Sequence, residues 1–296
     1  MVSAFLLGAA AVALGGLHDP ATISVLTTGY KFTEGPVWRA DGTLLFSDIP
    51  ADRIYTGTGH VFREPSGKSN GLTLDREGRL IAAEHATRRV TRTEKDGSIT
   101  VLAERFEGKR FNSPNDVVVR SDGMIFFTDP PYGLGGGMKN SELGYSGTYA
   151  LNPETGAVTL ISKDFQRPNG LCLSPDENTL YVADTQGTHA PSDISGDIMA
   201  FERNADGGYS NGKLFCHLPG PDGIKADVKG NVWATCKEGV NIYDPQGQLL
   251  ESVNTPEEPK NCSFGGSDGK TLYVTALTSV YTVKTTVAGV HPAHKP

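Results

Sequence analysis

The sequence predicts an all-β protein, specifically a six-bladed β-propeller with four antiparallel strands in each blade. Three observations lead to this prediction. Six segments repeat one pattern of two apolar strands joined by a turn, and their starts lie 36 to 54 residues apart, which is typical of propeller blades. The 36 glycines and 18 prolines among 296 residues are typical of a chain with many tight turns. Beyond residue 18, no stretch of a dozen residues has the period of an amphipathic helix.

Each repeat starts with a short polar motif, continues as an apolar strand, turns, and returns as a second apolar strand. Asp-Gly and similar pairs in the turns supply the positive-φ positions that short hairpins require. The six segments are Glu34–Asp48, Asn70–Glu84, Asn115–Asp129, Asn169–Asp184, Asp222–Cys236 and Cys262–Ala276.

Further strand patterns complete the blades. Third strands are predicted at Gly147–Pro153 and Asp197–Asn204, and fourth strands at Ala157–Ser162 and Lys213–Leu218. The last repeat has only three strands and ends at Ser279–Lys284, while the unpaired segment Ile23–Gly29 precedes the first repeat. We expect this N-terminal segment to become the outer strand of the last blade, because an open ring leaves exposed strand edges. Two packed β-sandwiches are the alternative, but a sandwich needs no fixed repeat.

The predicted propeller is a single domain over residues 18–287, between an N-terminal segment at 1–17 and a tail at 288–296. Ala4–Leu17 is uncharged and shorter than the about 20 apolar residues that span a bilayer, so no membrane span is expected. It resembles the apolar part of an export signal that lacks its basic start. We therefore expect a periplasmic or secreted protein. The alternative is an ordinary helix or disordered tail on a cytoplasmic protein.

The first strand of every blade lines the central channel of a propeller, so the starts of the six repeats converge at one mouth. The first residues are Glu34, Asn70, Asn115, Asn169, Asp222 and Cys262. Five of the six carry the oxygen donors that Ca²⁺ and other hard cations prefer. The net charge of −7 is compatible with a cation and argues against a nucleic-acid partner. The sequence therefore predicts a divalent cation site, with a purely structural ring as the alternative.

The ends of the second strands return to the same mouth. They are Asp48, Glu84, Asp129, Asp184, Cys236 and Ala276. We expect the carboxylates among them to support the first ring through hydrogen bonds, or else to cap turns. Ring geometry could also bring Cys236 close to Cys262, and in an exported protein the two could form a disulfide.

Several motifs together resemble the gluconolactonase family, which has senescence marker protein, luciferin-regenerating enzyme and diisopropyl-fluorophosphatase relatives. The motifs are EGPVW at Glu34, RFNSPNDVVV at Arg110, FTDPPYGL at Phe127, PNGLCLSPD at Pro168 and GPDGIKAD at Gly220. The resemblance runs from about Glu34 to Tyr281. It implies a six-bladed propeller with one essential divalent cation in the channel, which is calcium, zinc, magnesium or manganese among members.

The resemblance implies site residues and a reaction. Glu34, Asn169 and Asp222 would be metal ligands, and Asn115 a ligand or a substrate contact. The implied reaction is the opening of a sugar lactone by water attack on a metal-polarised carbonyl, with Asp222 as the catalytic base. Arg110 would contact the substrate.

Two loops supply further candidates for substrate contact. Tyr132, which follows Asp129, could cover the sugar, and His189 lies in the loop QGTHAPSD. The glycine-rich segment at 132–147 is either a lid over the mouth or a plain connecting loop.

Other functions remain open at this point. Hydrolysis of another ester or of a phosphotriester at the same metal site is one alternative. A non-catalytic sugar-binding propeller is another, because fold alone does not determine function. A serine esterase is disfavoured, because no Gly-x-Ser-x-Gly segment stands at a turn from a strand into a helix, as the nucleophile elbow requires.

Overall fold

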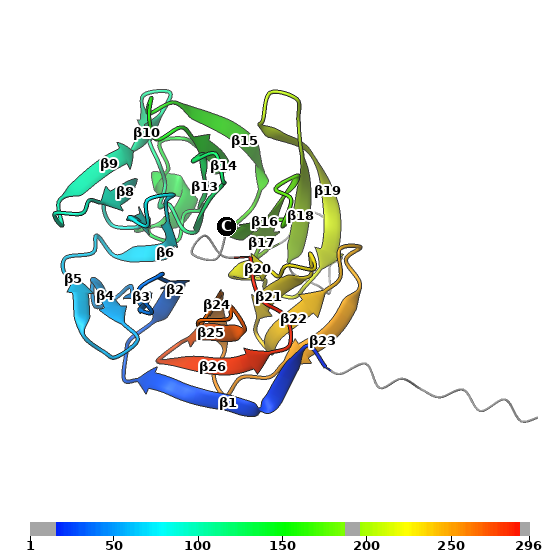
Figure 1. Cartoon of the computed structure of the whole chain (residues 1–296). Helices are drawn as coiled ribbons and strands as arrows, with labels where there is room; N and C mark the ends of the chain where they lie inside the picture. Colours follow the sequence, from blue (N-terminus) through cyan, green and yellow to red (C-terminus); the bar gives the residue numbers. More distant parts are fainter. Residues whose placement is uncertain (1–15, 187–195, 291–296) are drawn as a thin grey trace, which may run out of the picture.

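The computed structural model describes residues 16–186 and 196–290. Six four-stranded antiparallel sheets form a ring of blades (Figure 1), as the repeats predict. The N-terminal strand β1 (His18–Thr28) pairs with β26 (Ser279–Thr285) and becomes the outer strand of the sixth blade. This pairing confirms the predicted closure, which joins the two ends of the chain in one sheet.

The blades follow one another along the chain. Blade 1 contains β2 (Thr33–Trp38), β3 (Leu44–Asp48), β4 (Arg53–Thr56) and β5 (Val61–Arg63). Blade 2 contains β6 (Ser69–Leu74), β7 (Leu80–Glu84), β8 (Arg89–Thr93) and β9 (Ile99–Ala103). Blade 3 contains β12 (Val117–Val119), β13 (Ile125–Asp129), β14 (Ser146–Leu151) and β15 (Val158–Phe165).

The second half of the ring has the same order. Blade 4 contains β16 (Pro168–Leu173), β17 (Thr179–Asp184), β18 (Asp197–Arg203) and β19 (Tyr209–His217). Blade 5 contains β20 (Ile224–Ala226), β21 (Val232–Cys236), β22 (Gly239–Tyr243) and β23 (Leu249–Val253). Blade 6 contains β24 (Pro259–Gly265), β25 (Thr271–Ala276), β26 and β1.

Two short elements lie outside the blade sheets, the first between blades 2 and 3 and the second in the β13–β14 connection of blade 3. The strands β10 (Arg105–Phe106) and β11 (Lys109–Arg110) form a small hairpin, and η1 (Gly137–Asn140) is a single 3₁₀ turn. None of the helical structure in the described ranges is long and apolar enough to cross a membrane.

Residues 288–290, which the sequence analysis placed in the C-terminal tail, pair with the propeller. Residues 1–15, which hold most of the signal-like segment, and residues 291–296 lie outside the described residues. Between these limits, Val290 N donates to the Ala226 carbonyl and Val228 N to the Ala288 carbonyl, both at 2.9 Å. The segment after β26 therefore pairs with the backbone of blade 5 as far as Val290.

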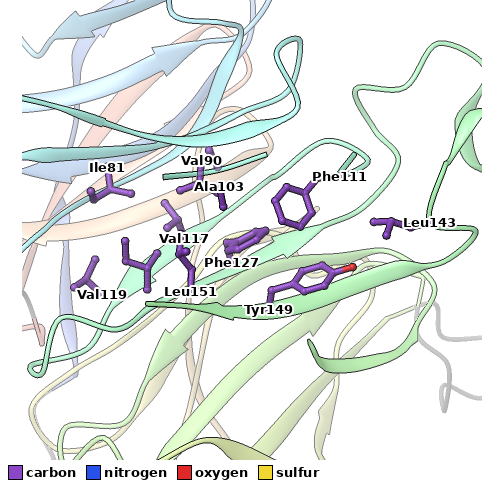
Figure 2. Close-up of a cluster of buried hydrophobic side chains, with 12 residues drawn as sticks. Ile81, Val90, Ala103, Phe111, Val117, Val119, Phe127, Leu143, Tyr149 and Leu151 are labelled. Carbon is purple, nitrogen blue, oxygen red and sulfur yellow. The ribbon is translucent and has the colours of Figure 1, made fainter. Parts of the chain in front are cut away.

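Apolar side chains of neighbouring blades pack together between the sheets. Figure 2 shows one such cluster, in which Ile81 and Val90 of blade 2 meet Val117 and Phe127 of blade 3. The Phe127 ring is fully buried and stacks on Tyr149 with ring centroids 5.3 Å apart. Burial of this kind stabilises the contact by about 25 cal/mol per Å² of apolar surface, so each blade depends on its neighbours.

The inner strands approach one another so closely that four blades have glycine after the first polar residue. A Cβ added at Gly35 would lie 2.0 Å from the Asn70 carbonyl oxygen, and one at Gly170 would lie 2.3 Å from the Asp222 carbonyl oxygen. Gly71 and Gly223 have equally close neighbours. Glycine is needed here for space as much as for its dihedral freedom.

The four cysteines are all buried and free, so the disulfide considered between Cys236 and Cys262 is not formed. Cys262 Sγ lies 4.0 Å from the carbonyl oxygen of Trp233, three residues before Cys236 on β21. At about 3.3 Å per residue, this offset is about 10 Å along the strand, which is beyond the reach of a disulfide.

Replacement of Gly170 by alanine is expected to lower the free energy of unfolding by about 1–3 kcal/mol, the usual cost of overpacking. The cause is the Asp222 carbonyl oxygen, 2.3 Å from the new methyl group. Urea unfolding of both proteins measures the difference. The matched control is Gly135→Ala, because an added Cβ there meets no atom within 4 Å; a change within about 0.5 kcal/mol is expected. Equal midpoints for the two variants would contradict the packing argument.

Candidate active site

The first strand of each blade brings one polar side chain to the same end of the ring. The six residues are Glu34, Asn70, Asn115, Asn169, Asp222 and Asn261. All except Asp222, which is partly exposed, are at most 5% exposed. Hydrogen bonds between blades hold them in place, since Ser47 Oγ donates to the Asn70 carbonyl at 2.8 Å and Thr128 Oγ1 to the Asn169 carbonyl at 2.7 Å.

The sixth member of this ring is Asn261, and the prediction of Cys262 was wrong by one residue. Asn261 pairs with Thr275, which stands one residue before the end of its strand, as Ser47 does in the pairing with Glu34. In blades 1, 2 and 4 the register shift lies at the polar residue or directly after it, whereas in blade 6 it lies before Asn261 and the pairing is regular from Asn261 to Gly265. The spacing from the polar residue to the apolar residues therefore differs in blade 6, and sequence alignment cannot detect this difference. The ring therefore has six oxygen-bearing side chains.

Glu34 and Asp222 are the two carboxylates of the ring, and they lie close enough to repel each other. Burial, followed by the charge of Asp222, raises the pKa of Glu34 well above its ordinary value. Burial is also the main cause that raises the pKa of Asp222 to about 7, and nearby Lys260 opposes this shift. Two neighbouring carboxylates with raised pKa values favour either a bound proton or a bound cation.

Asp116 is a third carboxylate that the sequence prediction missed. It follows Asn115, at the position that is glycine in four other blades, and it is 1% exposed. Its Oδ2 lies 3.5 Å from Lys225 Nζ and 3.5 Å from Asn261 Nδ2. The change from Asn-Gly to Asn-Asp in the third repeat was the available signal. Burial lowers the pKa of Lys225, but neighbouring groups, with the charge of Asp116 first, outweigh it and the net pKa is raised, so the ammonium group stays charged.

The aspartates at the ends of the second strands accept hydrogen bonds from backbone N–H groups of the segments that enter the first strands. Asp48 accepts hydrogen bonds from the backbone N–H groups of Lys31 and Phe32, which stand three and two residues before Glu34. Asp129 and Asp184 repeat this pattern before Asn115 and Asn169. These carboxylates cap the turn that enters each first strand, which was the simpler of the two expectations.

Glu84 differs from the aspartates in its partners. It binds Arg63, Arg89, Thr87 and Thr91 by side chain.

His85 and Asn70 form a polar pair beside the ring. Asn70 Nδ2 lies 3.3 Å from His85 Nε2, and burial lowers the pKa of His85 to about 4, which leaves the imidazole neutral at pH 7. Asn70 Oδ1 is buried and has no hydrogen-bond partner among the described residues. An unsatisfied buried oxygen of this kind suits a cation or a donor on a ligand.

The predicted substrate contacts lie in different places. Tyr132 is 37% exposed. Burial of its hydroxyl group is the main cause that raises the pKa of Tyr132 to about 12, and the charge of the nearby Asp222 adds to the shift. Arg110 belongs to the β10–β11 hairpin, where its Nη2 donates to the Thr87 carbonyl at 2.8 Å. His189 lies outside the described residues. Tyr132 is thus placed beside the ring, while Arg110 is bound to the backbone of blade 2.

The proposed lid segment is anchored at its C-terminal half. Ser141 Oγ donates to Asn112 Oδ1 at 2.5 Å, Asn112 Nδ2 donates to the Tyr145 carbonyl at 2.8 Å, and Leu143 is buried in the cluster of Figure 2. The part around η1, by contrast, has no buried residue.

The donor set fits a hard cation. In the described part of the chain, no group of three or more acidic, histidine or cysteine side chains has the geometry of a metal site. A cation between Glu34 and Asp222 would therefore take amide oxygens to complete its shell. Calcium accepts such mixed carboxylate and amide sets, with water in the remaining positions, and the orphaned Asn70 Oδ1 is one oxygen available there.

Comparison with known proteins gives consistent matches over nearly the whole chain. The gluconolactonase of Zymomonas mobilis is 33% identical, with 93% of this chain and 85% of that protein covered. Regucalcin of Xenopus laevis is 28% identical over 85% of each chain. The solved gluconolactonase of Xanthomonas campestris is 34% identical with a TM-score of 0.80, and 89% of each chain is covered. The model of the SMP-30/gluconolactonase/LRE-like region matches residues 32–278, and the chain therefore belongs to that family.

Proposed function

We propose that this protein is a lactone hydrolase of the gluconolactonase type that depends on one divalent cation. The observation that supports this most is the pair of neighbouring carboxylates, the buried Glu34 and the partly buried Asp222, inside a ring of amide side chains. A structural ring would not need two carboxylates that repel each other, because burial without a partner charge is costly. The gluconolactonase relatives support the substrate class.

Glu34, Asn169 and Asp222 would hold the cation, with Asn115 as a further ligand or as a contact to a sugar hydroxyl. Ca²⁺ is the favoured ion, because all of these side chains offer oxygen atoms; Zn²⁺, Mg²⁺ and Mn²⁺ are the other candidates. When bound, the cation supplies positive charge that polarises the lactone carbonyl and stabilises the negative charge that develops on its oxygen.

The chain's own residues position the substrate and transfer the proton. Asp222 takes a proton from water as the water oxygen bonds to the carbonyl carbon. The ring C–O ester bond then breaks, and the leaving alkoxide takes the proton back from Asp222, which gives an open hydroxy acid. Tyr132 covers the sugar beside Asp222 and limits the access of bulk water.

Replacement of Asp222 by asparagine is expected to lower kcat/KM for gluconolactone by at least about 100-fold, because the base and one carboxylate ligand are lost together. Proton release from the lactone measures the rate, with and without a chelator. The matched control is Asp206→Asn, a change of the same chemistry in the exposed β18–β19 turn. Equal rates in all samples would contradict the lactonase proposal, and a panel with aryl esters and phosphotriesters would then identify the hydrolysed bond.

The cation is expected to raise the melting temperature more at pH 8 than at pH 5. The folded-state pKa values of Glu34 and Asp222 are raised above their ordinary values of 4.5 and 3.8. In the cation-free protein, the stability from their bound protons is present below about pH 4 and is lost as the pH rises through about 7. Protons and Ca²⁺ compete for the same oxygens, so the ion stabilises the fold most when the carboxylates are charged.

Thermal unfolding with chelator or with saturating Ca²⁺ at the two pH values measures this difference. Asp222→Asn should remove most of it. A calcium-induced shift of equal size at pH 5 and pH 8 would contradict the assignment of the site to these carboxylates.

A further inference from the structure

We propose that the mouth contains an anion subsite, in which Arg167 binds a carboxylate or phosphate group on the lactone substrate. This inference rests on the proposed lactonase function and narrows its substrate class to lactones with an anionic substituent.

Arg167 is held at the mouth by its backbone. It stands directly before β16 and two residues before Asn169. Its N–H donates to Asp184 Oδ1 at 2.7 Å, and its carbonyl accepts from the Thr185 N–H at 3.1 Å. The same Thr185 is bound by its hydroxyl to Asn169 Nδ2 at 2.9 Å. The position of Arg167 is therefore coupled to that of the ring.

The guanidinium of Arg167 is half-buried and faces the ring of Tyr132. Its Cζ lies 5.3 Å from the Tyr132 ring centroid, which is the distance of a cation–π contact. It makes no hydrogen bond and no ion pair to any described residue, whereas other arginines such as Arg63, Arg79 and Arg120 are paired with carboxylates. A half-buried cation with five free donors is suited to a ligand that carries acceptors.

Lys260 is the second cation near the ring, but its charge is compensated. It directly precedes Asn261, and its Nζ lies 2.5 Å from Glu258 and 5.6 Å from the Phe32 ring centroid. Asp116 is likewise balanced by Lys225. A divalent cation would balance Glu34 and Asp222. Among the described residues, Arg167 is then a cation at the mouth without a carboxylate partner, in a chain with a net charge of −7.

The chemistry of this cation indicates the ligand group. A planar guanidinium donates two parallel hydrogen bonds to a carboxylate or a phosphate. An uncharged sugar carries neither of these groups. Tyr132 connects the two parts of the site, because it lies beside Asp222 on one side and under Arg167 on the other. A lactone with its carbonyl at the cation would place an anionic group on its far carbon near Arg167.

The test uses the full chain with saturating Ca²⁺ and three lactones. They are gluconolactone, which is uncharged, a glucarolactone, which carries a carboxylate, and gluconolactone 6-phosphate. We expect kcat/KM to be higher for at least one anionic lactone than for gluconolactone. Arg167→Gln should lower the kcat/KM of that lactone by about 10- to 100-fold more than that of gluconolactone. Arg167→Lys, which keeps the charge, should recover part of the preference.

The matched control is Arg39→Gln, because Arg39 is a partly exposed arginine in the β2–β3 turn at the opposite end of blade 1. It should leave all three rates unchanged. The anionic lactone that responds to Arg167→Gln identifies whether the ligand group is a carboxylate or a phosphate. If Arg167→Gln changes kcat/KM by the same factor for all three lactones, the anion subsite is wrong while the lactonase function stands.

Binding of the open-chain products separates failure of the subsite from failure of the proposed function. Calorimetry with glucarate, 6-phosphogluconate and gluconate needs no turnover. Tighter binding of a dianion than of gluconate, lost in Arg167→Gln, supports the subsite even if no lactone is hydrolysed. Equal binding of all three acids to the wild type overturns it.

Discussion

The close approach of neighbouring inner strands is the constraint on which the rest of the structure depends. Atoms of the next blade lie where a Cβ of the previous blade would stand, so Gly35, Gly71, Gly170 and Gly223 have room only for hydrogen. The nearest of these atoms are backbone carbonyl oxygens at Gly35 and Gly170, and side-chain atoms at Gly71 and Gly223. This spacing lets hydroxyls such as Ser47 and Thr128 reach the next blade's carbonyl. It also brings six polar side chains within reach of one another, because each stands directly before the crowded position.

The one acidic exception to the glycine pattern determines the charge of the channel. Asp116 replaces glycine in blade 3, and its carboxylate occupies space next to Gly71, where a Cβ would lie 2.5 Å from Asp116 Oδ1. A third carboxylate would be unfavourable beside Glu34 and Asp222, but Lys225 compensates it from blade 5. The ring therefore keeps two carboxylates that form no ion pair with any described residue, and their charges match that of one divalent cation.

The strand pattern predicted most of the fold because each blade is a local unit of about 40 residues, and its alternation and turns are visible in one stretch of sequence. Ring closure by Ile23–Gly29 was predicted because the last repeat has only three strands and this N-terminal segment has no repeat of its own. The pairing of β1 with β26 confirms it. The candidate ring was predicted in five blades. It was missed in blade 6, where the register shift lies before Asn261 and not after the polar residue as in blade 1, so that the polar position differs by one residue. Asp48, Asp129 and Asp184 were found as a set, but their backbone partners became clear only from the hydrogen bonds.

The sequence by itself determined the number of blades, the closure of the ring and the oxygen-rich character of its mouth, because these depend on patterns that repeat along the chain. Only the tertiary structure decided which charges remain without a partner. Asp116 meets Lys225, and Lys260 meets Glu258, whereas Arg167 meets the face of Tyr132. Most of these contacts join residues far apart in sequence. Coulomb energy depends on distance and burial in space, and a one-dimensional pattern contains neither.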